Sequence, residues 1–165
     1  MSNNLVLFLL LLFLISCNNT EIKKTEYKDQ IGDTTFNPSI DNPEFQFCDS
    51  TNVLHKRALI KYSGGKKALN EDLLKLYEYQ PVYGDFNGYF IIRFAVNCKN
   101  ETGRFRIEIL DDNFNLTEYP EQLKQHVTTI FKTLDKWNHA VYRNKDYDGY
   151  TFRTLKITNG KIELL

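Results

Sequence analysis

Residues 89–96 read Tyr-Phe-Ile-Ile-Arg-Phe-Ala-Val, residues 104–109 read Arg-Phe-Arg-Ile-Glu-Ile, and these two stretches decide the fold class. In each of them apolar residues recur at every second position, a spacing that indicates a β-strand with one buried face. The apolar set of the first stretch is Phe90, Ile92, Phe94 and Val96, and that of the second is Phe105, Ile107 and Ile109. The short polar connection between them ends at Gly103, which predicts an antiparallel pair.

Helical spacing flanks the strand pair on both sides. Residues 66–79 carry apolar side chains three and four positions apart, and Pro81 ends this predicted helix. Residues 120–137 begin with proline, which is favoured in the first turn of a helix. They carry a continuous apolar stripe of Leu123, Val127, Ile130, Phe131, Leu134 and Trp137. Two amphipathic helices that each bury one stripe are therefore predicted.

The dipeptide Asn159-Gly160 predicts a two-residue β-hairpin. The turn sets a register in which Thr158, Ile157, Lys156 and Leu155 pair with Lys161, Ile162, Glu163 and Leu164, in that order. The apolar pairs then share one face of the sheet, and the Lys-Glu pair lies on the other face. The predicted order of elements is helix, two strands, helix, two strands.

Residues 5–15 are uninterrupted apolar residues. A bilayer core of ~30 Å needs roughly 20 residues of helix, so this run predicts the apolar region of a signal peptide. A buried apolar helix fits less well, because such helices carry polar positions. The following Leu14-Ile15-Ser16-Cys17 resembles the bacterial lipobox, whose cysteine is diacylated and begins the mature protein. Residues 1–16 are therefore predicted to be a lipoprotein signal peptide and Cys17 a lipid anchor.

This anchor predicts a protein of the bacterial cell envelope that is attached to a membrane without spanning it. Asn18 is not the Asp that is typical of inner-membrane retention, which favours the outer membrane. The sequence that follows is polar, includes Pro38 and Pro43, and has no sustained period. We therefore predict a lipidated flexible tether over residues 17–44 and one folded domain over residues 45–165.

The composition of the chain indicates which partners and which cellular compartment are compatible with it. Lys plus Arg and Asp plus Glu number 21 each, so no net charge attracts nucleic acid. Aromatic residues make up 14% of the chain, which suits a packed sheet or an aromatic binding surface. Cys48 and Cys98 favour a disulfide in an oxidising envelope, with two buried free thiols as the alternative.

Motifs for catalysis or metal binding are weak. Residues 144–149 copy the first half of a calcium loop, but the twelfth position is Leu155 where a bidentate Glu is needed, which favours a polar turn. The three histidines lack the spacing of a zinc site. The chain contains no Gly-x-Ser-x-Gly and no P-loop, and Gly64-Gly65 lacks the other glycines of a dinucleotide fingerprint. We predict a protein that is not an enzyme and holds no cofactor or metal.

Three arginines on one strand face have two interpretations. Arg93, Arg104 and Arg106 could cluster with Tyr89 as a patch for an acidic peptide or glycan. The alternative, a solvated face that they share with Glu108, is the commoner outcome for such residues.

Several of these residues stand in an order that resembles the C-terminal domain of TonB proteins, in the forms common in Bacteroidetes. That family opens with Gly-Gly and an Ala-Leu helix, which corresponds here to residues 62–69, Tyr-Ser-Gly-Gly-Lys-Lys-Ala-Leu. A strand with Phe-x-Val-Asn follows, here residues 94–97, and then a glycine turn. The family's second helix ends in Trp with Ala three residues on, here Trp137 and Ala140. The match spans about residues 59–165.

The resemblance implies an α+β fold in which two helices pack on one face of a three- to four-stranded antiparallel sheet. In the family, this domain binds a short segment of an outer-membrane transporter by adding it as a strand to the edge of the sheet. An edge strand offers unpaired backbone donors and acceptors, which explains this mode of binding. The corresponding edge here is the C-terminal strand, with Lys161, Ile162, Glu163 and Leu164 as the expected partner-binding residues.

The sequence therefore predicts a membrane-anchored envelope lipoprotein with a non-enzymatic, TonB-like protein-binding domain that is accessory to outer-membrane transport. Its expected partners are a membrane, through the lipid anchor, and a protein or peptide, but no nucleic acid. The alternative is a structural envelope lipoprotein, or a small-ligand carrier that uses the aromatic content.

Overall fold

The computed structural model describes residues 35–55, 59–118 and 121–163. The predicted signal peptide, the lipidation site Cys17 and most of the predicted tether lie outside these residues. Leu164, the last of the expected partner-binding residues, also lies outside them.

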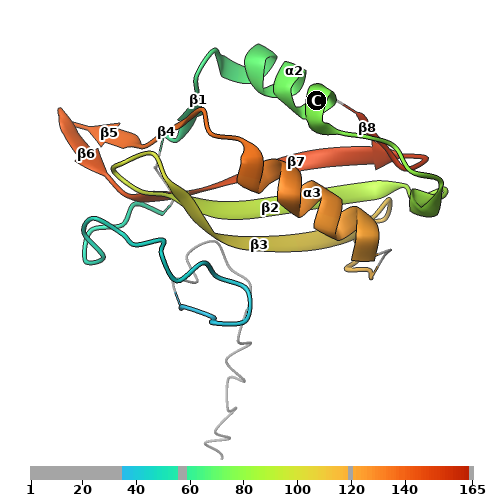
Figure 1. Ribbon diagram of the computed structural model, residues 1–165, viewed down its shortest axis with the longest axis horizontal. Helices are drawn as coiled ribbons and strands as arrows, with labels where there is room; N and C mark the ends of the chain where they lie inside the picture. The colour runs from blue at the N-terminus through green and yellow to red at the C-terminus, as the bar shows by residue number, and fades with distance from the viewer. Residues whose placement is uncertain (1–34, 56–58, 119–120, 164–165) are drawn as a thin grey trace, which may run out of the picture.

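Two helices and one four-stranded sheet form the body of the domain (Figure 1). The sheet has the strand order β3-β2-β7-β8, and every neighbouring pair is antiparallel. Two small two-stranded sheets, β1 with β4 and β5 with β6, complete the fold. In chain order the elements are β1 (Lys61–Tyr62), α2 (Gly65–Leu76), the 3₁₀ helix η2 (Pro81–Tyr83), β2 (Gly88–Val96), β3 (Thr102–Asp111), α3 (Glu121–Thr133), β4 (Trp137–Asn138), β5 (Ala140–Tyr142), β6 (Lys145–Tyr147), β7 (Gly149–Thr158) and β8 (Lys161–Glu163).

Both helices cover the same face of the sheet, as Figure 1 shows. Their buried side chains share one hydrophobic cluster with the alternate apolar residues of β2. The helices contribute Leu69, Leu73, Leu123, Val127, Ile130 and Phe131, and β2 contributes Phe90, Ile92, Phe94 and Val96. The predicted α+β class, with two helices and antiparallel strands, is confirmed.

The glycine pair before α2 has a conformational reason. Gly64 and Gly65 have φ values of 82° and 71°, in the left-handed region that favours glycine. A Cβ atom on Gly64 would lie 2.6 Å from the Cβ of Ala68, so the tight entry into the helix leaves no room for a side chain. This turn brings α2 directly after β1.

The predicted end of the second helix was wrong. The helix ends at Thr133, and Trp137 lies in β4, where it pairs with Tyr62 of β1. The two rings pack edge to face with centroids 4.8 Å apart, and Trp137 is buried in the same core as the helical stripe. Because Trp137 is buried in this core, it continues the apolar spacing of the helix in the sequence, although its own backbone is extended. The first helix likewise ends at Leu76, before the predicted Tyr79.

The C-terminal hairpin has the predicted register. Lys156 pairs with Glu163, Ile157 with Ile162 and Thr158 with Lys161. The fourth predicted pair involves Leu164 and lies outside the described residues. β7 is ten residues long and lies between β2 and β8 in the sheet. Within the described residues, β8 pairs with only the last three residues of β7. Residues 144–149 were predicted to be a polar turn, and they include β6 of a further hairpin.

Part of the predicted tether is packed against the domain. Residues 35–44 lie on the side of the sheet opposite the helices (Figure 1). Asp41 is buried there, with ion pairs of 2.7 Å to Arg106 and 3.2 Å to Arg104 of β3. The ordered contacts of the domain therefore begin before Phe45, which was the predicted boundary. Sequence patterns missed them because a single buried carboxylate in a polar segment produces no periodic signal.

Candidate functional site

The edge of the sheet formed by β8 and β7 is the candidate binding surface. β8 is the last strand of the sheet, and within the described residues its ladder with β7 runs from Thr158 to Lys156. Among the described residues, no strand pairs with Thr151–Leu155 of β7 on the side that faces away from β2. Among the described residues, the unpaired backbone of this edge therefore continues from β8 along β7.

The direction of the backbone groups along this edge follows from one hydrogen bond. The N–H of Tyr150 donates to the carbonyl oxygen of Leu54 at 2.8 Å, on the side of β7 away from β2. In an antiparallel ladder, successive residues direct their backbone groups alternately to the two sides. Phe152 and Thr154 therefore also direct N–H and C=O toward the open side. The Phe152 carbonyl accepts a hydrogen bond of 2.7 Å from the Arg153 guanidinium.

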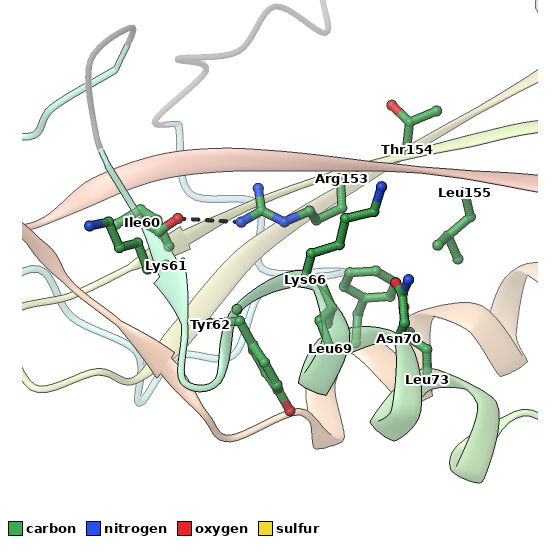
Figure 2. Close-up of a pocket in the computed structure, with 12 residues that line it drawn as sticks. Ile60, Lys61, Tyr62, Lys66, Leu69, Asn70, Leu73, Arg153, Thr154 and Leu155 are labelled. Carbon is green, nitrogen blue, oxygen red and sulfur yellow. Dashed lines mark hydrogen bonds between the residues drawn. The ribbon is translucent and has the colours of Figure 1, made fainter. Parts of the chain in front are cut away.

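A groove lies beside this edge, between β7 and the chain segment that runs from β1 into α2 (Figure 2). Its volume is about 520 Å³, within the range of roughly 300–1,000 Å³ that is usual for small-molecule sites. Apolar side chains from α2, α3, β7 and the residue before β1 form its walls, namely Leu69, Leu73, Phe131, Leu155 and Ile60. The groove is therefore an opening in the main hydrophobic core of the domain.

The charged residues that line the groove are all cationic. Lys61, Lys66 and Arg153 contribute to its surface, and no Asp or Glu of the described chain does. Figure 2 shows the Lys66 side chain extending from the start of α2 toward β7, from which the Arg153 side chain also projects into the groove. The described residues provide no ion-pair partner for any of these three cations.

Neutral groups surround the Arg153 guanidinium. It donates to the carbonyl oxygens of Phe152 and Ile60, at 2.7 and 3.3 Å, and to the Thr151 hydroxyl at 3.0 Å. Its central carbon lies 5.0 Å from the centre of the Trp137 ring. Burial lowers the pKa of Arg153, because a partly buried cation loses hydration.

The position of α2 at the groove is fixed by a polar contact on its other side. The Tyr62 hydroxyl donates to the Asp72 carboxylate at 2.6 Å, and Lys136 forms an ion pair with the same oxygen at 2.7 Å. Burial and the hydrogen bond to Asp72 raise the pKa of Tyr62, so the phenol keeps its proton. The Lys136 hydrogen bond, with the Tyr62 hydrogen bond, lowers the pKa of Asp72. These contacts join α2 to β1 and to the residue before β4.

The turn between β7 and β8 is held in a similar way. The Tyr77 hydroxyl donates to the Gly160 carbonyl, and the Gly160 N–H donates to the Phe86 carbonyl at 3.0 Å. Burial, with the neighbouring Tyr83 and Tyr79 phenols, raises the pKa of Tyr77 to about 12, so it remains a donor near neutral pH. The hairpin that carries the candidate edge is therefore anchored at its turn.

The predicted site residues fall in separate places. Cys48 and Cys98 form a disulfide, which is the pairing that the sequence favoured. Lys161, Ile162 and Glu163 form β8, and Glu163 lies 3.3 Å from Lys156 of β7. The sequence analysis did not find the unpaired part of β7 or the groove. The sequence feature that could have indicated the groove is Arg153, a cation that shares the alternation of the buried residues Leu155 and Ile157.

The remaining candidates of the sequence have structural contacts. Asp148, at the fifth position of the calcium-like loop, accepts backbone hydrogen bonds of 2.8 Å from Asp49 and from Cys98. Its carboxylate also lies near the sulfurs of the disulfide, which are not available as thiolate ligands. Arg104 and Arg106 contact Asp41, and Arg93 forms an ion pair of 3.0 Å with Glu108. Arg93 therefore pairs with Glu108 as the second interpretation expected, but the two side chains are only 19% and 20% exposed, so they do not form a solvated face.

The histidines lie apart from the groove. Nδ1 of His126 and the Tyr83 hydroxyl are 2.8 Å apart, and Nε2 accepts a longer contact of 3.4 Å from the Glu78 N–H. His139 lies 3.0 Å from Asp146, and His55 stacks on Tyr150 with ring centroids 5.3 Å apart.

Within the described residues, no helix has the length and apolar character that a membrane span requires. A scan of protein-family models, a search of curated proteins and a search of solved structures each found no match to this chain.

Proposed function

We propose that this chain is a membrane-anchored lipoprotein of the bacterial cell envelope, whose domain is a non-enzymatic protein-binding module of the TonB C-terminal-like type. The open edge of β8 and β7 is the observation that carries the proposal. Two helices on one face of an antiparallel sheet, with the C-terminal hairpin at its edge, are compatible with the resemblance.

Binding would occur by strand addition to this edge. An extended polypeptide would receive hydrogen bonds from the outward N–H groups of Phe152 and Thr154, and would donate to outward carbonyl groups. Ile162 of β8 lies opposite Ile157 of β7, between the pairs Lys156–Glu163 and Thr158–Lys161. Because backbone groups alternate along the ladder, those of Ile162 face away from β7. Main-chain bonds would supply affinity, and the neighbouring side chains would supply specificity.

The natural setting of such a module is an envelope protein that reaches its partner from a lipid anchor. A partner in the outer membrane, such as a transporter segment, would then be within range of a chain fixed at Cys17. The proposal makes this protein accessory to transport and gives it no catalytic step.

The test uses a library of displayed random peptides selected on the full chain. Thr154→Pro removes an outward donor while sparing the ladder to β2, because the Thr154 N–H does not face β2. Thr154→Val keeps this N–H and serves as the matched control. We expect selected peptides to bind the proline variant roughly tenfold more weakly than the valine variant.

Far-UV circular dichroism establishes that both Thr154 variants are folded before their affinities are compared. Equal affinity of two folded variants would show that the selected peptides do not add to β7. An inability to select any peptide on the full chain would also count against the proposal.

A further inference from the structure

Beyond peptide binding, we propose that the groove between β7 and α2 binds a long-chain fatty acid, with its hydrocarbon chain against the apolar walls and its carboxylate at Lys66 and Arg153. This ligand class is independent of the partner that adds to the sheet edge. It requires a side-chain cavity, whereas strand addition requires backbone groups.

The walls of the groove favour a hydrocarbon chain. Leu69, Leu73, Phe131 and Leu155 present carbon atoms to the cavity. A peptide placed deep in the groove would need a hydrogen-bond partner for each of its amide groups, and these side chains provide none. A methylene chain has no such requirement, and its transfer from water to an apolar cavity is favourable.

The charges of the groove favour an anionic head group. Three cations line it, and among the described residues no carboxylate compensates their charge. Arg153 gives the clearest evidence, because it is partly buried and its hydrogen bonds to described residues go to neutral oxygen atoms. A guanidinium has five N–H donors and prefers a planar carboxylate, so donors remain for a ligand. Burial removes part of the hydration of this cation, and an anionic ligand would replace the lost water contacts with charge-assisted hydrogen bonds.

The distribution of the two properties defines the ligand. Lys66 begins on the exposed first turn of α2, while Leu69 and Leu73 of the same helix face the core. The groove therefore combines a cation on its exposed side with apolar walls that face the core. A single-chain molecule with one terminal carboxylate matches both properties.

The experiment adds a photoactivatable palmitate to isolated membranes that contain the full chain, and maps the cross-linked peptides by mass spectrometry. We expect labelling within residues 61–73 and 153–155. Unlabelled palmitate should abolish this labelling, while hexadecanol, which has the same chain without the charge, should compete roughly tenfold more weakly.

Three variants test the role of the cations. Arg153→Gln and Lys66→Gln should each reduce the labelling roughly tenfold. Lys67→Gln is the matched control, because Lys67 is the adjacent residue of α2, is exposed and lies 3.9 Å from Glu71, outside the groove. It should leave the labelling unchanged. Lys66→Gln keeps the test valid if Arg153→Gln does not fold, because Lys66 is exposed.

Four results would overturn the proposal. These are labelling confined to other parts of the chain, equal competition by hexadecanol, equal loss in the Lys66 and Lys67 variants, and stronger competition by lysophosphatidic acid than by palmitate. The last result would assign the groove to a phosphate head group.

Discussion

Arg106 holds the carboxylate of Asp41 with two hydrogen bonds, of 2.7 Å from Nη1 to Oδ1 and of 3.0 Å from Nη2 to Oδ2. The Asp41 side chain is only 1% exposed, and Arg104 contributes a third contact of 3.2 Å. This pairing joins the N-terminal segment to β3 on the face of the sheet that the helices leave uncovered.

Removing the Asp41 charge should destabilise the domain. Asp41→Asn removes the charge of a buried carboxylate that two partly buried arginines contact, and breaking a buried ion pair in this way costs about 3 kcal/mol or more. Urea unfolding followed by circular dichroism measures the change. Asp112→Asn, at an exposed loop position, should shift the free energy of unfolding by less than about 0.5 kcal/mol. Equal effects of the two substitutions would contradict a stabilising role for this contact.

The same contact predicts an acid limb of stability. Burial alone would raise the pKa of Asp41, but the Arg106 hydrogen bond, with those from the Asn37 N–H and Arg104, holds it below its usual value. A carboxyl whose pKa is lower in the folded state contributes stability above its unfolded pKa of about 4, and loses it as the pH falls through the folded pKa. The free energy of unfolding should therefore decline below about pH 4. The decline should be smaller in Asp41→Asn, with a remainder from Asp72 and Asp111, whose pKa values are also lowered.

The disulfide should make a large contribution to stability. Cys48 and Cys98 are 50 residues apart, and closing a loop of that length stabilises the folded state by about 4 kcal/mol in the chain-entropy model. The double variant Cys48→Ser/Cys98→Ser should lose most of this free energy in urea unfolding. The reduced wild-type chain should show a similar loss. Unchanged stability in both would contradict a structural role for the bond.

The lipid anchor can be tested directly. Wild-type protein should incorporate labelled palmitate and sediment with membranes, whereas Cys17→Ser should do neither. Because a single cysteine carries the proposed anchor, Cys48→Ser provides the control for substitution of a cysteine elsewhere. Unlabelled wild-type protein would overturn the proposed localisation.

Local patterns predicted the elements whose cause is local. The period of two in residues 89–96 and 104–109 predicted the β2–β3 pair, and Asn159-Gly160 predicted the hairpin register. The second helix was predicted to extend to Trp137, because burial against Tyr62 and burial on a helical stripe place an apolar residue at the same spacing.

The candidate site was only partly predictable, because two of its features arise from distant parts of the chain. Within the described residues β7 has ten residues and β8 has three, so part of β7 has no partner on that side, and neither length follows from the turn between them. The groove is lined by Leu69 of α2 and Leu155 of β7, which are far apart in the sequence, so no local pattern encodes it. The expectation for Lys161, Ile162 and Glu163 came from a family resemblance and stays a prediction.

Hydrogen exchange of individual backbone amides in the full chain, with and without a selected peptide, tests the proposed edge binding most directly. Strand addition predicts that exchange slows roughly tenfold or more at the outward amides of Phe152, Thr154 and Ile162. The alternate amides of Arg153 and Leu155, which face β2, should change little. Protection at other surfaces, with these three outward amides unchanged, would contradict the account.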